Sequence, residues 1–250
     1  MHSSRGYIGK KLVSYLRQND FAHAGEAEAI DLVMRKFKKT PNQKILDAGC
    51  GLGGTAKYIQ DQGWGIVTGF DIENKSINYA QRRYKSIDFY VSDVIQVDQL
   101  FETNTFDIIC LFNSFYAFDD QTKALSTLWK ISNHTSTLAI FDYAISTNSK
   151  NFFYGEKFKL HSPFSPVITG QIENVLQSTK WNLTELLDIS EKYLIWYKAL
   201  INKLNEKKDQ ILDLFGLAAY KKAHDTYTDI YNALENKTLG GVIVYAEKHS

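Results

Sequence analysis

The chain has 250 residues, of which 44% are hydrophobic and 14% aromatic, so it can bury one sizeable core. Lysine and arginine total 29 against 28 for aspartate and glutamate, with no block of like charge, so a basic surface for nucleic acid is not expected. No apolar run reaches the roughly 18 residues of a membrane span, and charged residues interrupt the N-terminus where a signal peptide would lie, so we expect a cytoplasmic protein without a membrane partner.

The chain begins with two predicted helices and then alternates strands with helices. Apolar residues recur at helical spacing over residues 7–16 and 26–37. From residue 44 onward, short apolar runs bounded by turn residues alternate with helical patterns, which predicts a parallel sheet covered on both faces. The predicted strands are 44–48, 65–70, 87–92, 106–112, 137–143 and 181–189, and the predicted helices between them are 55–62, 75–84, 121–131 and 169–180.

A glycine-rich turn at residues 44–54, K-I-L-D-A-G-C-G-L-G-G, organises the rest of the chain. Its apolar start predicts a strand, and the pattern after Gly54 predicts the start of a helix. Glycine is favoured at such a turn because it accepts a positive φ and lets a ligand approach the backbone. The ligand expected at this turn is a nucleotide-like cofactor.

Two interpretations of the turn compete. Gly49, Gly51 and Gly54 satisfy the dinucleotide pattern G-x-G-x-x-G, and Asp71 follows 20 residues after Gly51, where an acid that binds ribose belongs. However, Asp47 would repel a pyrophosphate and attract the ammonium of an amino-acid-like cofactor. A short-chain reductase would also need Tyr-x-x-x-Lys well downstream of the turn, and the only match in the sequence lies upstream, at positions 7 and 11.

Polar residues end four successive predicted strands. They are Asp47, Asp71, Asp93 and Asn113, spaced 24, 22 and 20 residues apart. Because the carboxyl ends of parallel strands meet at one edge of a sheet, we expect these side chains to share a ligand site. The alternative for each acid is a helix cap without a ligand.

Four segments resemble the successive motifs of class I S-adenosylmethionine-dependent methyltransferases. They are L-D-A-G-C-G-L-G-G at 46–54, G-F-D at 69–71, S-D-V at 92–94 and F-D-I-I at 106–109. The similarity is greatest to the small-molecule group that includes sarcosine/dimethylglycine and phosphoethanolamine N-methyltransferases. It covers residues 44–144 and returns at 239–248.

The resemblance implies one domain over residues 1–250 with a doubly wound, mostly parallel, seven-stranded α/β sheet. Residues 44–145 would form the cofactor-binding core, and residues 1–40 an N-terminal helical cover. Two lid insertions are expected, a loop at 146–168 and an antiparallel helical pair at 190–236 that breaks at Gly216. The C-terminal segment 237–250 would add an antiparallel edge strand beside residues 181–189.

The cofactor implied by the resemblance is S-adenosyl-L-methionine, with S-adenosyl-L-homocysteine as product. Asp71 would bind the ribose hydroxyls and Asp93 the adenine amino group. Asn113 would offer its backbone carbonyl or its side chain to the methionine ammonium. The full set of implied cofactor residues is Asp47, Gly49, Cys50, Gly51, Asp71, Ile72, Asp93, Val94 and Asn113.

Aromatic residues near the expected sulfonium are candidates to bind the methyl acceptor. An aromatic ring can stabilise an ammonium through cation–π attraction. The plain alternative is aromatic packing beneath a loop, and His23 can equally be a loop histidine without a task. The acceptor-site candidates are Tyr7, Tyr116, Phe118, Tyr143, Trp196 and Tyr197, and the candidates for a catalytic role are Tyr116, Asp142 and His23.

The predicted function is transfer of a methyl group to a small-molecule acceptor, with an amine favoured over oxygen or carbon. Alignment and desolvation would carry the reaction. A non-catalytic protein that binds the cofactor and another protein is the alternative. No metal is expected, since Cys50 and Cys110 lack zinc-site partners and Asp119 with Asp120 is a weak ligand pair. The helical pair could also join two copies, so the chain is expected to be a monomer or a homodimer.

Overall fold

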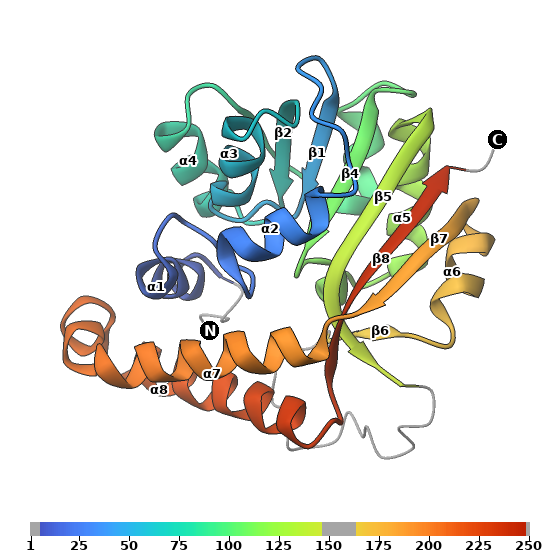
Figure 1. The fold of residues 1–250 in the computed structure, drawn as a ribbon. Coiled ribbons are helices and arrows are strands. Elements are labelled where there is room, and N and C mark those ends of the chain that lie inside the picture. Colours follow the sequence, from blue (N-terminus) through green and yellow to red (C-terminus); the bar gives the residue numbers. More distant parts are fainter. Residues whose placement is uncertain (1–5, 147–163, 249–250) are drawn as a thin grey trace.

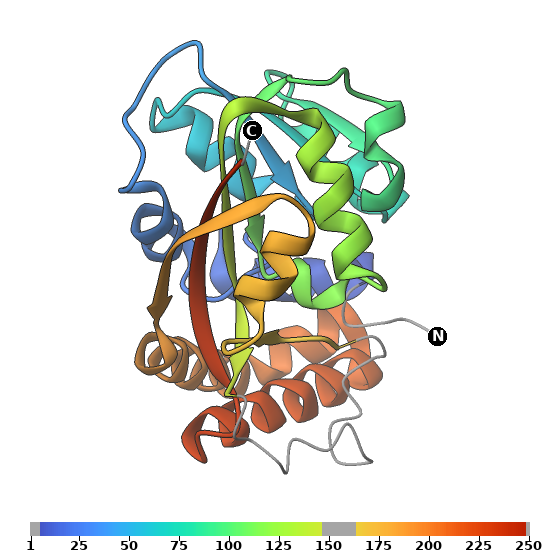
Figure 2. The same cartoon turned by 90° about the vertical axis from the view of Figure 1, so that its right-hand side faces the viewer.

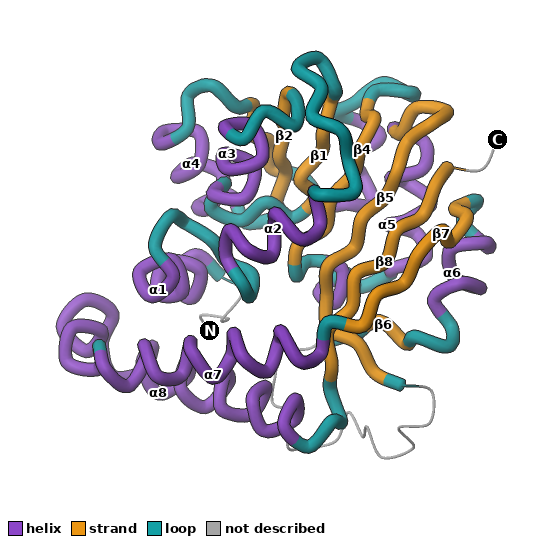
Figure 3. Tube along the Cα trace, in the orientation of Figure 1, coloured by secondary structure: helices purple, strands orange, loops and turns teal. Residues whose placement is uncertain are grey.

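A computed structural model describes residues 6–146 and 164–248, and it contains a mostly parallel sheet (Figures 1 and 3). The order β3-β2-β1-β4-β5-β8-β7 forms the continuous sheet, and the two-residue strand β6 pairs with β5. The strands are β1 (Lys44–Ala48), β2 (Ile66–Asp71), β3 (Asp88–Val91), β4 (Phe106–Phe112), β5 (Ser132–Ile145), β6 (Val167–Ile168), β7 (Trp181–Asp188) and β8 (Gly240–Lys248). The predicted doubly wound α/β architecture is confirmed, with β6 as an addition to the seven strands expected.

Helices cover both faces of the sheet. One face packs against α1 (Tyr7–Arg17), α2 (Glu26–Met34), α3 (Gly54–Asp61), α4 (Asn74–Arg83), α7 (Ser190–Glu206) and α8 (Lys208–Glu235). The other face packs against η1 (Val94–Gln99), α5 (Gln121–Ile131) and α6 (Ile172–Ser178), and Figure 2 shows α5 and α6 side by side. Because strand side chains alternate, Ile45 faces the first core and its neighbour Leu46 the second.

The expected edge position of the C-terminal strand is wrong. β8 lies between β5 and β7 and pairs antiparallel with both, so β7 is the edge strand. Successive residues of β8, such as Ile243 and Val244, are buried in opposite cores. A strand buried on both faces reads as a continuous apolar run, which is typical of a position inside a sheet.

The helical pair also differs from its predicted boundaries. α7 already ends at Glu206, and Gly216 is a kink inside α8 with φ 82° and ψ 164°. No atom lies within 4 Å of a Cβ placed on Gly216, so its positive φ, rather than lack of space, favours glycine there. Residues 147–163, most of the other predicted insertion, lie outside the described residues. None of the helices in the described parts of the chain is long and apolar enough to cross a bilayer.

Asp20 fixes the N-terminal cover to the core. Its buried carboxylate accepts hydrogen bonds from Ser14 Oγ at 2.6 Å and Tyr84 OH at 2.7 Å. Tyr79 OH donates to both carboxylate oxygens at 3.1 Å, and Arg83 forms an ion pair at 2.8 Å. Since Tyr79, Arg83 and Tyr84 belong to α4 or follow it directly, one side chain joins the end of α1 to α4.

Replacing Asp20 by Asn should destabilise the protein. The amide cannot accept all of these donors and loses the ion pair, which should lower the free energy of unfolding by roughly 1.5–3 kcal/mol. Chemical denaturation would measure the change. Asp61→Asn is the matched control because Asp61 is a half-exposed partner of Lys57 within one helix. Equal stability of the two variants would show that Asp20 does not hold the cover.

Candidate active site

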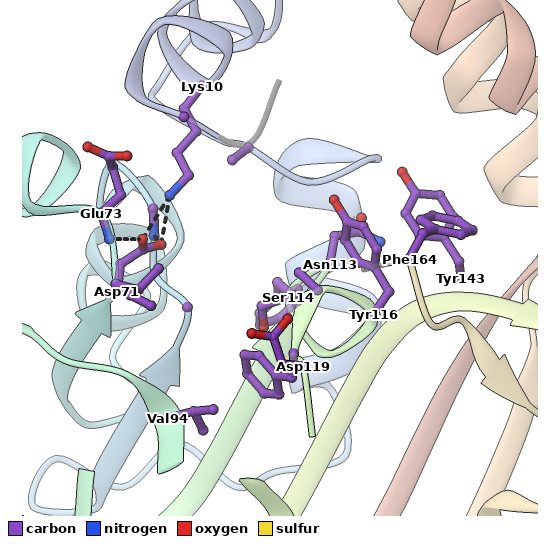
Figure 4. Close-up of a pocket in the computed structure, with 18 of the residues that line it drawn as sticks. Lys10, Asp71, Glu73, Val94, Asn113, Ser114, Tyr116, Asp119, Tyr143 and Phe164 are labelled. Carbon is purple, nitrogen blue, oxygen red and sulfur yellow. Dashed lines mark hydrogen bonds and ion pairs between the residues drawn. The ribbon is translucent and has the colours of Figure 1, made fainter. Parts of the chain in front are cut away.

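A cavity of about 440 Å³ opens at the carboxyl ends of the parallel strands (Figure 4). Its wall comes from the glycine turn, the ends of β2 and β3, the loop after β4, α1 and the helical pair. We call its two regions the glycine-turn end (Gly49, Gly51, Asp71, Ile72, Asp93 and Val94) and the tyrosine end (Tyr116, Tyr143, Phe164, Tyr197 and Tyr227). Three of the four strand-end residues, Asp71, Asp93 and Asn113, therefore line one cavity, whereas Asp47 does not.

The glycine turn is closed tightly onto its neighbours. Gly49 and Gly51 have φ values of 84° and 57°. A Cβ on Gly49 would lie 2.5 Å from the Cβ of Ser114, whose hydroxyl donates to the Ala48 carbonyl at 2.7 Å. Side chains are thus excluded at Gly49 by both space and backbone conformation. Cys50 takes part through its backbone, while burial raises the pKa of its thiol, which is not among the lining groups.

Asp71 is the most heavily hydrogen-bonded acid of the glycine-turn end. Its carboxylate accepts the backbone N–H of Gly51 and of Glu73, each at 2.9 Å. The ammonium of Lys10, on α1, contacts both carboxylate oxygens at 2.9 and 2.8 Å (Figure 4). Lys10 thus stands where a ribose was expected to bind, and sequence reasoning missed it because the register of α1 against β2 is a tertiary feature.

The remaining part of the glycine-turn end offers an apolar surface beside an acid. Ile72 is 69% exposed although it is a large apolar residue, and with Val94 it lines the cavity. Asp93 Oδ1 caps η1 by accepting the Ile95 N–H at 3.1 Å, and Asp93 also lines the cavity. The helix-cap interpretation of Asp93 is therefore correct without excluding a ligand.

Asp47 is buried behind the glycine turn rather than on the cavity wall. Its Oδ2 has no hydrogen-bond partner among the described residues. Burial, and next the charge of Asp71, raise the pKa of Asp47 to about 7, against an opposing hydrogen bond from the Ala56 backbone. A buried carboxylate with an orphaned oxygen is costly, and a cationic ligand at the adjacent turn would offset that cost.

Asn113 has a left-handed backbone, with φ 48°, at the point where β4 enters its loop. Its side chain accepts the Ala24 N–H at 3.2 Å and donates to Tyr193 OH at 2.9 Å. The side chain is thus committed to the N-terminal cover and to α7. Of the two expected ways to bind an ammonium, this favours the backbone carbonyl.

The tyrosine end is a set of neighbouring aromatic rings. The ring of Tyr116 lies 5.0 Å from that of Tyr143 and 5.2 Å from that of Phe164. Tyr197 lies 6.2 Å from both Tyr143 and Tyr227, and the hydroxyls of Tyr143 and Tyr197 are hydrogen-bonded. Three predicted residues, Tyr116, Tyr143 and Tyr197, are therefore brought together, whereas Tyr227, which lies within the predicted helical pair, was not among the predicted acceptor residues. Phe118 also lines the cavity.

Arg17 is a buried cation behind the tyrosine end. It is 7% exposed and donates to the His23 carbonyl, and it lies close enough to Tyr197 to lower the pKa of that phenol against the larger effect of burial. No carboxylate in residues 6–146 or 164–248 lies within ion-pair distance of it. Since no described carboxylate neutralises it, the positive charge of Arg17 lowers the pKa values of the nearby Tyr193, Tyr197 and Tyr227, against the larger effect of burial.

Two expected catalytic residues lie outside the cavity wall. His23 contacts the Ala24 carbonyl at 2.9 Å through Nδ1 and Thr55 Oγ1 at 3.0 Å through Nε2, and burial lowers its pKa to about 3. Asp142 accepts the N–H groups of Tyr143 at 2.7 Å and Tyr116 at 3.1 Å, and burial raises its pKa to about 7. His23 is thus a neutral packing residue, and Asp142 positions the loop that carries Tyr116.

Two expected acceptor residues are also absent from the wall. The ring of Tyr7 packs 6.3 Å from that of Tyr79. Trp196 donates its indole N–H to Glu28 at 2.9 Å, and its ring fills the space where a Cβ on Gly25 would lie. Tyr7 thus packs α1 against α4, and Trp196 packs α7 against α2. The described residues contain no group of three or more side chains suited to hold a metal ion.

The sequence of the chain is similar to those of known methyltransferases. Residues 46–140 match the family described as "Methyltransferase domain". The phosphoethanolamine N-methyltransferase of Plasmodium falciparum is 25% identical over 224 residues, covering 83% of this chain and 79% of that protein. An O-methyltransferase of Pyrenophora dematioidea is 24% identical over 169 residues, covering 64% of this chain and 61% of that protein.

A solved structure shares the fold. Phosphoethanolamine N-methyltransferase 2 of Haemonchus contortus, in complex with phosphomonomethylethanolamine and S-adenosylhomocysteine, superposes with a TM-score of 0.85 at 17% identity. The match covers 98% of this chain and 58% of that one. The methyltransferase domain matched over residues 46–140, the methyltransferase relatives and the sheet order support a class I S-adenosylmethionine-dependent methyltransferase.

Proposed function

We propose that the protein methylates the nitrogen of a small amine that also carries an anionic group. The tyrosine end of the cavity carries this proposal, because its wall consists of aromatic rings and hydroxyls. Aromatic faces attract a positively charged nitrogen, and neutral phenols donate hydrogen bonds to an anion. Among the described acids that line the cavity, Asp71, Glu73 and Asp93 lie at or just after the ends of β2 and β3, whereas Asp119 and Asp120 follow Tyr116 in the loop after β4.

The glycine-turn end supplies groups that fit the cofactor. Gly49 and Gly51 leave the backbone open to a ligand, and exposed Ile72 offers an apolar surface to an adenine ring. The orphaned oxygen of Asp47 favours a cationic ligand. These observations support Asp47, Gly49, Gly51, Ile72 and the neighbouring Asp71, Asp93 and Val94 as cofactor-binding residues.

The protein's own contribution to the reaction is alignment and charge stabilisation. When bound, S-adenosylmethionine supplies an electrophilic methyl group on a positively charged sulfur. The rings of Tyr116, Tyr143 and Tyr197 would stabilise the positive charge that grows on the attacking nitrogen, at about 0.5–2 kcal/mol per contact. Burial raises the pKa of both Tyr143 and Tyr197, so they act as neutral donors rather than as bases, and the amine must arrive unprotonated.

The buried charge of Arg17 supports an anionic group on the acceptor. The charge of Arg17 acts on Tyr197, whose hydroxyl is hydrogen-bonded to that of Tyr143. A buried cation without a counter-ion is unfavourable, and an anion near Tyr197 would offset that cost. The two phosphoethanolamine N-methyltransferases named above are consistent with such an acceptor, whereas the Pyrenophora O-methyltransferase keeps oxygen as the second candidate acceptor atom.

Three amines with the same two-carbon spacing test the proposal: ethanolamine, 3-aminopropionate and O-phosphoethanolamine. At least one of the two anionic amines should be methylated with a kcat/KM about tenfold or more above that of ethanolamine, the scale of one charge-assisted interaction. Mass spectrometry of the product would give the methylated atom. Turnover of phenols but of no amine would show that the acceptor atom is oxygen rather than nitrogen. Cofactor binding without turnover of any acceptor would favour a non-catalytic binding protein.

Replacing Arg17 by Met should remove the preference for the anionic amine. The ratio of its kcat/KM to that of ethanolamine should fall about tenfold, mainly through KM, because the charge that attracts the anion is lost. Arg17→Lys should restore part of the ratio. Arg35→Met, at an exposed position, is the control. An unchanged ratio in a folded Arg17→Met protein would leave Arg17 with a purely structural role.

Replacing Asp47 by Asn should stabilise the ligand-free protein at alkaline pH and weaken cofactor binding. The folded-state pKa of about 7 lies above the ordinary 3.8, so the folded state binds the proton more tightly. This contribution to stability is present below pH 4 and lost as the pH rises to about 7, above which the buried charge destabilises. At pH 8 the variant should gain roughly 1–3 kcal/mol, measured by denaturation.

The gain from Asp47→Asn should shrink toward pH 4, where both proteins carry a neutral side chain. Isothermal titration at pH 8 should show weaker binding of S-adenosylmethionine to the variant, since the field that favours a cation is lost. Tighter cofactor binding by the variant would contradict the assigned role of Asp47.

A further inference from the structure

Among the described residues that line the cavity, Lys10 carries the one lysine or arginine side chain, and this side chain forms an ion pair with Asp71. Its ammonium contacts both oxygens of Asp71, and Gly51 and Glu73 each donate a backbone N–H to the same carboxylate. An ionised carboxylate has about four acceptor positions, and these four contacts use them. Ribose hydroxyls therefore cannot bind Asp71 unless Lys10 leaves it.

The side chain of Lys10 can leave while its helix stays in place. α1 is fixed to α4 through Asp20, and the Lys10 side chain is 14% exposed within the cavity. Its Cδ and Cε lie 3.7 and 3.9 Å from the position of a Cβ on Gly51, so its stem runs along the glycine turn. A lysine on a flexible stem can move its ammonium over several ångströms by rotamer changes alone.

A cofactor with an amino-acid tail brings a new partner for this ammonium. The tail carries a carboxylate, and the described lining residues otherwise present acids to it: Asp71, Glu73, Asp93, Asp119 and Asp120. A carboxylate near the glycine turn would be repelled by these acids and attracted by Lys10. The ribose of this ligand therefore displaces Lys10 from Asp71, and the carboxylate of its amino-acid tail gives the Lys10 ammonium a new partner.

We propose that Lys10 exchanges partners when the cofactor binds, from Asp71 in the ligand-free protein to the carboxylate of the cofactor's amino-acid tail. The exchange makes Lys10 a specificity-determining residue. Every adenosine ligand must break the contact between Lys10 and Asp71, but a tailless nucleoside gives Lys10 no new anion. The site thus selects adenosines that carry an amino acid over those that do not.

Two ligands test separately the two steps of this exchange, the loss of the contact between Lys10 and Asp71 and the gain of the tail carboxylate. S-adenosylhomocysteine carries ribose and tail, whereas 5′-methylthioadenosine carries the ribose and a thioether without the tail. Isothermal titration of the full chain would measure both affinities in the wild type and in Lys10→Met. The variant should bind 5′-methylthioadenosine about tenfold more tightly, because Asp71 is free, and S-adenosylhomocysteine about tenfold more weakly, because the tail has lost its cation.

The controls use the neighbouring lysine and the conservative variant. Lys11 lies over the Tyr79 ring at 4.0 Å and outside the cavity wall, so Lys11→Met should change neither affinity more than about twofold. Lys10→Arg keeps the charge and should keep the wild-type preference for the tailed ligand. Circular dichroism and thermal unfolding would confirm that each variant is folded.

Other outcomes would overturn the exchange. If Lys10→Met tightens both ligands alike, Lys10 only blocks the site and does not bind the tail. If it weakens both ligands, Lys10 is a constant ligand of the cofactor and does not compete for Asp71. Unchanged affinities for both ligands would exclude any role for Lys10 in cofactor selection.

Discussion

Three consecutive backbone amides tie the glycine turn to the end of β2, and the glycine-turn end of the cavity depends on them. Gly49 and Cys50 both donate to the Phe70 carbonyl at 2.9 Å, and Gly51 donates to Asp71 at 2.9 Å. The in-register pairing of β1 with β2 sets this geometry. Gly69, opposite Asp47, leaves room because a Cβ there would lie 2.9 Å from the Cys50 sulfur. One strand pair thus fixes the turn and the acid together.

The cavity changes electrostatic character along its length. Acids dominate the lining away from the tyrosine end, and Asp47 adds a further buried carboxylate behind the turn. At the tyrosine end, Asp142 holds the backbone of Tyr116 and Tyr143, and the positive charge of Arg17 acts on Tyr197 and Tyr227. On the proposal above, the positively charged methyl donor would lie beside Asp71 and Asp93, and the anionic group of the acceptor would lie toward Arg17. This arrangement orients both reactants before any contact specific to the transition state forms.

Much of the glycine-turn end could be predicted from the sequence because it follows strand by strand. Each strand end carries its own polar residue, so the positions of Asp71 and Asp93 depend only on parallel pairing. Lys10, Arg17 and Tyr227 could not be predicted in the same way, because they reach the cavity from helices whose docking depends on side chains distant in sequence. The continuous apolar stretch of β8 is typical of an interior strand, whereas the family resemblance predicted an edge position.

The residue pattern of the sequence also could not distinguish aromatic side chains that line the cavity from those that pack one helix against another. Tyr193, Trp196 and Tyr197 share one helix, yet only Tyr197 is part of the wall. Asn113 bonds the hydroxyl of Tyr193, and Glu28 accepts the indole N–H of Trp196. The distinction depends on partners contributed by other elements. The placement of His23 away from the cavity wall has the same origin, since Thr55 and the surrounding rings enclose its side chain.

The interior place of β8 has a consequence for how the sheet is assembled. Among the described strands, β7 pairs with β8 alone, and β8 comes after all the others in the sequence. Because β8 follows β5 and β7 in the sequence, the edges of β5 and β7 that face β8 stay unpaired during synthesis until residues 240–248 are available. Unpaired edges of this kind recruit strands from other molecules. Chains that stop before residue 240 should accordingly depend on chaperones, whereas a chain that includes residues 240–248 fills the gap between β5 and β7 with its own strand.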